Sequence, residues 1–453
     1  MTLFTKDENP VRTPAAAFEM ISPQQAFDTV IEVASRCVLP VELVSFDVAQ
    51  GHVVGEDVIA QDPVPAYRAS IKDGYAVRSS DGPGLYPVVF ECHAGLEVDN
   101  CMSLEEKHVA YISTGGPLPD GADAVVQIED TRMTSDVVDG KHSVVEILKS
   151  VTSGEDVREI GSDMRPGEVV LEKGEYIGPG EVSMLATVGL TDIPVYRKPI
   201  VAVISTGDEV EEPTIQVLPR GKVRDSNRAM LVTAVSEAGA RAHDLGIVRD
   251  SENLVEASIQ EAVSMGADVI ITTGGVSMGN KDFIKPILEK LGTIHFGKIC
   301  MKPGKPCTFA TIPREGSTDV IVFGLPGNPV SALTTFHLLV SPCIRRLAGH
   351  SIQNLVVRAY AATASPIKVD PLRTEYRRVH IKFETDPSNQ HSSGTLVAHD
   401  IAGSQISSRI MSYCGANALL EVPSLKQQPV DGGILQPGTV LPVLMLQNKR
   451  ILQ

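Results

Sequence analysis

Residues 267–282 read ADVIITTGGVSMGNKD, an apolar run that changes abruptly into glycine, serine and an acid. Four further segments show the same change where an expected strand stops: ISTGDE at 204–209, GIVRD at 246–250, MKPGKP at 301–306 and FGLPGNP at 323–329. In an open α/β sheet, ligands bind beyond the carboxyl ends of the strands. The five segments therefore predict one shared ligand pocket at that edge of a sheet.

The sequence around these segments predicts several kinds of domain. Residues 199–349 alternate apolar runs with helical patterns, which indicates an α/β domain with a mostly parallel sheet. Residues 61–151 carry short β-prone runs divided by glycine and proline turns, as a small β-rich domain does. From residue 350 onward about five strands and no strong helix are expected, typical of a barrel-like domain.

The N-terminal part predicts a lead and a helix. Residues 1–18 have the composition of a disordered lead. Ser22 and Pro23 then suit the N-cap and the first position of a helix. Residues 155–198 hold several turns and a short helix, and we expect them to return and pack with this first helix.

Composition excludes some classes of function. The 453 residues are too many for one core and suggest three or four units. A net charge of −16, without a basic run longer than two residues, argues against a nucleic-acid partner. Seven scattered cysteines, never spaced CxxC, favour reduced thiols over a zinc or disulfide framework. With neither a signal peptide nor an 18-residue apolar stretch, we expect a cytoplasmic protein without a membrane span.

The segment TTGGVSMGNKD has the order of a phosphate or oxyanion loop. Gly274, Gly275 and Gly279 allow the backbone to approach a ligand, and Ser277 adds a hydroxyl group. Asp282 opens the next helix and is either an acid at the ligand or only the N-cap of that helix. The segment has neither the Walker pattern nor GxGxxG, so it indicates no ordinary nucleotide site.

Two proline-containing segments offer groups that favour anions. MKPGKP places Lys302 and Lys305 around a stiff turn, which suits a compact oxyanion, although a solvated lysine turn is the alternative. FGLPGNP has Asn328 as N-cap and Pro329 as the first helical residue. That pattern is explained equally by helix initiation and by an anion site at a helix N-terminus.

Several acids are expected near the same sheet edge, namely Asp208, Glu209, Asp250 and Asp282. Carboxylates beside an anion repel it unless a hard cation lies between them, and oxygen ligands without histidine or cysteine suit Mg²⁺. Scattered surface acids are the alternative. The turns in ASIKDGYAV and STGGPLPDGADAVV, taken alone, indicate no particular function.

All these segments, together with SNRAML at 226–231 and SSRIMSYCGANALLEVP at 407–423, resemble one family. This family is that of the molybdopterin molybdenumtransferases, also called molybdenum insertases. It includes bacterial MoeA, the E domain of the plant molybdenum insertase and the E domain of gephyrin. The resemblance runs from about residue 20 to the end, with the motifs in family order.

The resemblance implies a homodimer whose chains have four domains. A linking domain would comprise residues 19–60 and 152–198. The β-rich second domain would comprise residues 61–151, the α/β molybdopterin-binding domain residues 199–349, and the barrel-like domain residues 350–453.

The resemblance also implies a reaction, the Mg²⁺-dependent insertion of molybdate into adenylylated molybdopterin with release of AMP. It gives catalytic roles to Asp250, Asp282 and Asp73, the first two with the metal. Molybdate would lie among Lys302, Lys305, Pro306, Arg378 and Ser408. The other substrate-binding residues would be Thr114, Glu209, Gly274, Gly275 and Ser277, and Asp73 and Thr114 would reach the pocket of the other subunit.

Partners and alternatives follow from the same resemblance. The adenylylated substrate must come from a molybdopterin adenylyltransferase on a separate chain or in a region outside this one. One alternative is a gephyrin-like scaffold that binds receptor loops or cytoskeleton with the same fold. Another is an adenylyltransferase, but the additional domains and MKPGKP argue against it.

Overall fold

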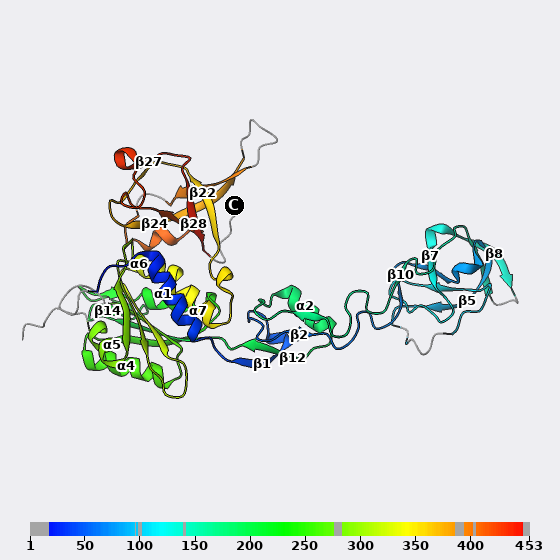
Figure 1. Ribbon diagram of the computed structural model, residues 1–453, viewed down its shortest axis with the longest axis horizontal. Coiled ribbons are helices and arrows are strands. Elements are labelled where there is room, and N and C mark those ends of the chain that lie inside the picture. Colours follow the sequence, from blue (N-terminus) through cyan, green and yellow to red (C-terminus); the bar gives the residue numbers. More distant parts are fainter. Residues whose placement is uncertain are drawn as a thin grey trace, which may run out of the picture. The chain divides into compact units, whose positions relative to one another are not determined.

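The structure is a computed structural model, shown in Figure 1. It describes residues 18–95, 97, 102–138, 142–275, 283–385, 394–401 and 405–446. The chain divides into two compact units. One unit comprises Met1–Glu42, Gly51–Gly55 and Val195–Gln453, and the other comprises Leu43–Gln50 and Glu56–Pro194.

A six-stranded sheet lies at the centre of the α/β part of the first unit, in the order β16–β13–β17–β21–β20–β18. The first four strands pair in parallel, whereas β20 is antiparallel to both of its neighbours. The mostly parallel sheet predicted from the sequence is therefore confirmed. The strands are β13 (Ile200–Thr206), β16 (Arg241–Val248), β17 (Val269–Thr273), β18 (Thr293–Lys298), β20 (Pro306–Ile312) and β21 (Val320–Leu325).

Helices cover both faces of this sheet. Successive residues of a strand point to opposite faces, and here the residues on both faces are apolar. Val201 and Val203 belong to one apolar core with α1, α3, α6 and α7, while Ala202 and Ile204 pack with α4 and α5. The helices are α1 (Pro23–Arg36), α3 (Asn227–Glu237), α4 (Glu252–Ser264), α5 (Ile284–Leu291), α6 (Pro329–Thr335) and α7 (Ser341–Leu347), with a π-helical turn at Phe336–Val340. Burial on both faces explains the continuous apolar runs of the central strands.

Helix α1 begins as the sequence predicts, with Ser22 as N-cap and Pro23 in the first turn. Ser22 Oγ accepts from the Gln25 backbone N–H at 3.2 Å, and Gln25 Oε1 accepts from the Ser22 N–H at 2.9 Å. This reciprocal pair satisfies two helix-end donors. The buried face of α1, including Val30, lies in the core of the α/β sheet, so the helix packs there and not with residues 155–198 as expected from the sequence.

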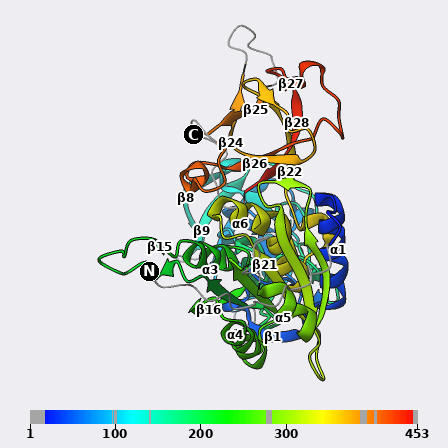
Figure 2. The same cartoon turned by 90° about the vertical axis from the view of Figure 1, so that its left-hand side faces the viewer.

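The C-terminal part of the first unit is a five-stranded barrel in the order β24–β25–β22–β28–β26, closed by pairing of β26 with β24 (Figure 2). Alternate residues fill its interior, including Val379, Ile381 and Leu420. This confirms the predicted barrel. The strands are β22 (Arg358–Thr363), β24 (Thr374–Glu384), β25 (Thr395–Asp400), β26 (Ala418–Val422) and β28 (Val440–Met445), with a small ladder of β23 (Ile367–Lys368) and β27 (Ile434–Leu435).

Two short ladders complete the fold of the first unit. Strand β19 (Met301–Lys302) leaves the α/β part and pairs in parallel with β24 of the barrel. Strands β14 (Val210–Glu211) and β15 (Val223–Arg224) form a parallel pair beside the α/β sheet.

The second unit is rich in strands, as the sequence predicts for residues 61–151. A mixed six-stranded sheet has the order β7–β4–β6–β5–β9–β8. Its strands are β4 (Gly74–Val77), β5 (Gly84–Cys92), β6 (Val109–Ile112), β7 (Ala124–Gln127), β8 (Thr131–Val138) and β9 (His142–Ile147). Three two-stranded ladders pair β1 (Val41–Ser45) with β12 (Asp192–Tyr196), β2 (Val58–Ile59) with β11 (Val169–Leu171), and β3 (Ala69–Ser70) with β10 (Val157–Arg158), and helix α2 spans Pro179–Thr187. Within the described stretches, no helix is long and apolar enough to cross a membrane.

Candidate functional site

A hollow of about 920 Å³ lies in the first unit, between the loop at 301–306 and the barrel. Asn328 and Ser331 at the start of α6 also line it. The pairing of β19 with β24 holds the loop in place, because Lys302 lies in register with Glu375. The segments MKPGKP and LPGNP therefore share a pocket with the barrel, and its size suits a small-molecule ligand.

Cationic side chains outnumber acidic ones in the lining of this pocket by two. The cationic residues are Lys302, Lys305, Lys368, Arg373 and Arg377, and the acidic residues are Asp370, Glu375 and Asp400. The surplus matches the charge of a dianion, in a protein whose net charge is strongly negative.

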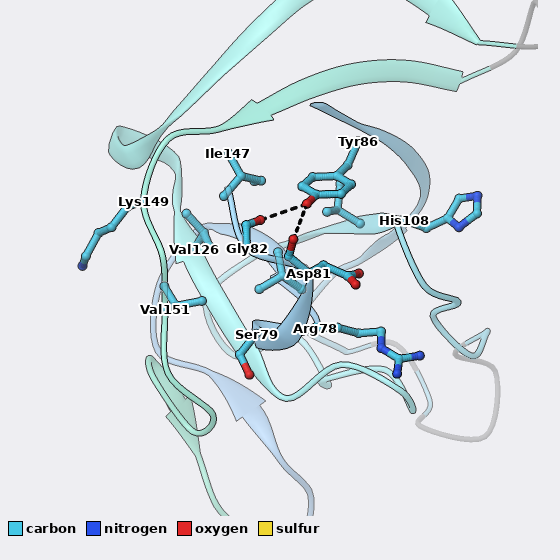
Figure 3. A pocket seen from close by; sticks show the side chains of 12 residues that line it. Arg78, Ser79, Asp81, Gly82, Tyr86, His108, Val126, Ile147, Lys149 and Val151 are labelled. Carbon is cyan, nitrogen blue, oxygen red and sulfur yellow. Dashed lines mark hydrogen bonds between the residues drawn. The ribbon is translucent and has the colours of Figure 1, made fainter. Parts of the chain in front are cut away.

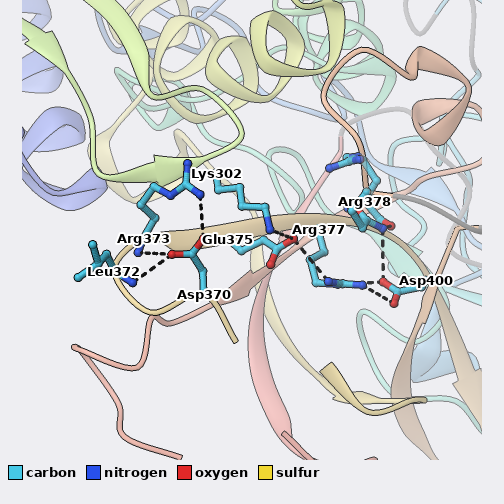
Figure 4. Close-up of polar contacts among 9 residues, drawn as sticks. Lys302, Asp370, Leu372, Arg373, Glu375, Arg377, Arg378 and Asp400 are labelled. Carbon is cyan, nitrogen blue, oxygen red and sulfur yellow. Dashed lines mark hydrogen bonds and ion pairs between the residues drawn. The ribbon is translucent and has the colours of Figure 1, made fainter. Parts of the chain in front are cut away.

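Four ion pairs use some of these charges, as Figure 4 shows. They are Arg373–Asp370 at 2.9 Å, Arg377–Asp400 at 2.6 Å, Lys302–Glu375 at 3.4 Å and Arg377–Glu375 at 3.4 Å. Lys305 and Lys368 line the pocket and have no ion pair with any residue that the structure describes. Their ammonium groups are therefore the ones most available to a bound anion.

Arg378 lies apart from the lining of this pocket. In β24 the side chains alternate, so Glu375 and Arg377 face the hollow while Arg378 points to the opposite side of the strand. Its side chain is fully buried, and its Nε donates to Ser412 Oγ at 3.1 Å. Burial lowers the pKa of the Arg378 guanidinium, and its Nη1 and Nη2 have no hydrogen-bond partner among the described residues.

Ser408 and Pro306 lie near the pocket in different ways. Pro306 lines it at the start of β20. Ser408 is exposed, whereas the preceding residue, Ser407, lines the pocket and accepts a hydrogen bond from the Val330 N–H at 3.2 Å.

The glycine loop meets three other motifs at the carboxyl edge of the sheet. Gly274 has φ +91°, and a Cβ there would lie 2.4 Å from the carbonyl oxygen of Thr206. Gly275 also has positive φ, at +64°. Asn227, which is buried, donates through Nδ2 to Thr273 Oγ1 at 2.7 Å and to the Gly327 carbonyl at 2.8 Å. ISTGDE, TTGG and LPGNP, three of the five segments expected at this edge, thus come together, and SNRAML joins them.

Two predicted site residues of this loop, Ser277 and Asp282, lie outside the described residues. The N-cap position of α5 is Phe283.

Carboxylates gather at the ends of β13 and β16. The backbone N–H of Asp250 donates to Asp208 Oδ1 at 3.1 Å, and Arg249 donates to the Asp208 carbonyl at 3.1 Å. Asp250 is half-buried, and Glu209 is exposed in the turn that follows β13. In the described part of the chain, no three His, Cys, Asp or Glu side chains are grouped as metal ligands.

Asp73 and Thr114 meet in the second unit. Asp73 directly precedes β4 and Thr114 follows β6, at the end of this antiparallel pair where Gly74 lies opposite Ile112. The Thr114 N–H donates to Asp73 Oδ1 at 2.6 Å, and both residues are exposed. The two residues that the resemblance groups together are therefore neighbours.

A second hollow, in the second unit, is too small to be a ligand site (Figure 3). It has a volume of about 10 Å³, roughly that needed for one water molecule. The Tyr86 hydroxyl beside it already donates to the carbonyls of Asp81 and Gly82, at 2.8 and 3.0 Å. The cation-rich pocket is the better candidate.

Two family models match stretches of the chain. Residues 21–189 match the model of the MoeA N-terminal region (domain I and II), and residues 202–346 match that of a probable molybdopterin binding domain. The molybdopterin molybdenumtransferase of Bacillus subtilis is 34% identical over 84% of this chain and 86% of its own length. The chain belongs to the molybdopterin molybdenumtransferase family. The resemblance seen in the sequence is thereby confirmed.

Two further proteins are similar to most of this chain. The molybdenumtransferase fold is shared with a crystal structure of the molybdopterin biosynthesis MoeA protein from Pyrococcus horikosii, with a TM-score of 0.74 and 29% identity over 95% of this chain and all of that one. Gephyrin from Dictyostelium discoideum is 34% identical over 95% of this chain. The chain spans 63% of the length of that gephyrin.

Reasoning from the sequence missed several residues that line the pocket. Lys368, Arg373, Glu375 and Arg377 come from the barrel and lie outside the glycine-rich segments. One signal was available, because Glu375 and Arg377 are two residues apart in a strand and must share a face. Asn227 joins the glycine loop to LPGNP through two buried hydrogen bonds. Nothing in the sequence indicated this role apart from its position in SNRAML.

Proposed function

We propose that this member of the molybdopterin molybdenumtransferase family inserts molybdenum from molybdate into adenylylated molybdopterin and releases AMP. The observation that carries this proposal is the pocket between the loop at 301–306 and the barrel, with its surplus of cations and two lysines that pair with no acid among the described residues. An oxyanion with two negative charges would balance this surplus.

The chemistry of molybdate fits the groups present. It is a tetrahedral dianion without apolar surface, so its affinity must come from charge-assisted hydrogen bonds. Lys302 and Lys305 line the pocket as the proposed donors, with Pro306 fixing the loop. Arg378, which the resemblance groups with molybdate, points to the other side of β24 and is therefore left out of the proposed donor set.

The proposed Mg²⁺ fits the oxygen donors at the ends of β13 and β16. Asp250, with Asp208 beside it, offers carboxylate oxygens, which hard cations prefer, and Asp282 is proposed as a further ligand. Bound there, the metal would neutralise charge that develops when the phosphoric anhydride is cleaved.

The glycine loop at the carboxyl edge of the α/β sheet would bind the nucleotide portion of adenylylated molybdopterin. Gly274 and Gly275 leave room for a close approach of a ligand to the backbone. Ser277 is proposed to contact a phosphate, and Glu209 is proposed as a further substrate contact.

The partners also belong to the proposal. We infer a homodimer to which Asp73 and Thr114 contribute as a hydrogen-bonded pair. A molybdopterin adenylyltransferase, on another chain or in a region outside this one, would supply the adenylylated substrate.

A crystal soaked with molybdate and AMP tests the location of the site. Anomalous scattering at the molybdenum edge should give a peak in the pocket lined by Lys302 and Lys305. A molybdenum peak elsewhere, with the pocket lacking one, would show that the anion site has been misplaced.

A further inference from the structure

Glu375 is a buried carboxylate within the proposed anion pocket. It lies on β24, with a side chain only 3% exposed, and it lines the pocket. A negative charge next to a site for a dianion should weaken binding by simple electrostatics. Its presence there therefore calls for a physical reason.

The contacts of Glu375 suggest that reason. Its Oε1 lies 3.4 Å from Lys302 Nζ and 3.4 Å from Arg377 Nη1 (Figure 4). Arg377 is held further by Asp400, through contacts of 3.1 and 2.6 Å. One carboxylate oxygen thus contacts two of the pocket's cations.

The backbone fixes this arrangement. Lys302 of β19 is in register with Glu375 of β24, and in a parallel pair such partners point to the same side of the sheet. Arg377 is two residues further along β24, on the same side. The three side chains therefore form a row along the pocket wall, set by the pairing of the loop with the barrel.

We propose that Glu375 is a positioning residue that holds Lys302 and Arg377 toward the bound anion. The inference rests on the proposed function of the pocket as a molybdate site. Glu375 acts through these two cations and need not touch the anion itself.

Positioning should outweigh repulsion for two reasons. The charge of Glu375 is already opposed by two cations, so its effect on the anion is largely cancelled. The Lys302 side chain is 41% exposed and sits on a flexible stem, so without its partner it is free to turn into water. Binding would then have to reorder it, which costs about threefold to tenfold in affinity for each such side chain.

Direct binding of molybdate, measured by calorimetry on the full chain, separates the two effects by sign. Glu375→Gln keeps the shape and removes the charge. Positioning predicts that the molybdate dissociation constant rises about threefold to tenfold, whereas dominant repulsion predicts that it falls. A constant that falls or stays the same would overturn the inference.

Two further variants provide controls. Glu421→Gln makes the same change on β26, where Glu421 pairs with Arg358 outside the pocket, and it should leave molybdate binding within about twofold of the parent. Glu375→Asp retains the charge with a shorter reach, and it should also weaken binding, by less than the glutamine variant. If Glu375→Gln does not fold, Glu375→Asp replaces it in the test. An aspartate variant that binds molybdate like the parent would contradict positioning.

A double-mutant cycle shows whether Glu375 acts through Lys302. In a Lys302→Gln background, Glu375→Gln should weaken binding by clearly less than it does in the parent. Equal effects in both backgrounds would contradict the proposed route. Failure of the parent itself to bind molybdate would instead refute the proposed function, so the two failures are distinguishable.

Discussion

Lys305 is the most informative single residue of the pocket, because its ammonium group has no ion pair within the described part of the chain. We expect Lys305→Ala to raise the molybdate concentration for half-maximal insertion by about tenfold to a hundredfold. One charge-assisted hydrogen bond contributes about 1.5–3 kcal/mol, and about 1.4 kcal/mol corresponds to a factor of ten. Titrating molybdate while AMP release is followed measures the change.

The lysine control is Lys382→Ala, which removes an exposed lysine from the barrel strand β24, outside the pocket. It should bind molybdate like the parent. Excess molybdate should restore Lys305→Ala, since only affinity is lost. A folded Lys305→Ala variant that titrates like the parent would show that the anion binds elsewhere.

The sequence predicts some of these residues and not others, for a physical reason. Lys302 and Lys305 are recognisable because the signal is local, two cations around a stiff turn after a strand. The choice between Arg377 and Arg378 is not local, since it depends on which face of β24 meets the loop at 301–306. The strand register decides that face, and only the folded barrel sets it.

At the scale of single elements, the glycine loop has a position where a side chain does not fit. Gly274 combines φ +91° with a Cβ site 2.4 Å from a backbone oxygen of Thr206. Gly266 has φ +81° but open space around it. We expect Gly274→Ala to lower the free energy of unfolding by about 1–3 kcal/mol more than Gly266→Ala, because it adds a clash to the same strain. Urea unfolding of both variants measures the difference, and equal losses would contradict the close approach.

A buried histidine, His350, lies just beyond the end of α7 and should affect stability in acid. A helix C-terminus favours a protonated histidine, but burial is the larger effect, and together with Arg345 it lowers the pKa of His350 to about 4. The unfolded chain takes up a proton near pH 6.5 and the folded chain only near pH 4. The contribution of neutral His350 to the free energy of unfolding is therefore complete above about pH 6.5. It falls by roughly 3 kcal/mol as the pH drops toward 4, because protonation stabilises the unfolded chain.

His350→Gln tests this titration. The variant should flatten the dependence of melting temperature on pH between about 4 and 6.5. A slope equal to that of the parent would show that another group is responsible.

Helices and strands of the α/β part are well predicted from the sequence, since their apolar runs have the expected period and end at glycine or proline. The two-residue strand β19 is not predicted, because its existence depends on a partner strand far along the chain. The same non-local pairing brings Glu375 beside Lys302 and so builds the pocket wall.

At the scale of the whole molecule, the proposed homodimer makes a testable statement about complementation. If Asp73 of one subunit serves the site of the other, a mixture of Asp73→Asn and Asp282→Asn chains should recover part of the lost AMP release. Hybrid dimers would then contain one site free of both changes. Sedimentation should first show the dimer and subunit exchange, and exchanged mixtures without recovery would argue against a shared site.

The family and the fold class are predictable from the sequence, because motifs in a fixed order span most of the chain. The division into four domains stays a prediction. The barrel and the α/β part lie in one compact unit, and Leu419 and Leu444 of the barrel belong to the same apolar core as the α/β helices. Sequence composition changes near residue 350, but shared burial across that point is visible only in three dimensions.

The most direct test of the proposed activity is molybdate-dependent release of AMP from adenylylated molybdopterin by the purified protein. We predict that AMP appears only with molybdate and Mg²⁺ present, and that the product restores activity to a molybdoenzyme lacking its cofactor. Asp282→Asn should fold normally and abolish this release, because it removes a proposed metal ligand. AMP release that is indifferent to molybdate, or a folded parent without any turnover, would contradict the proposed insertion of molybdenum.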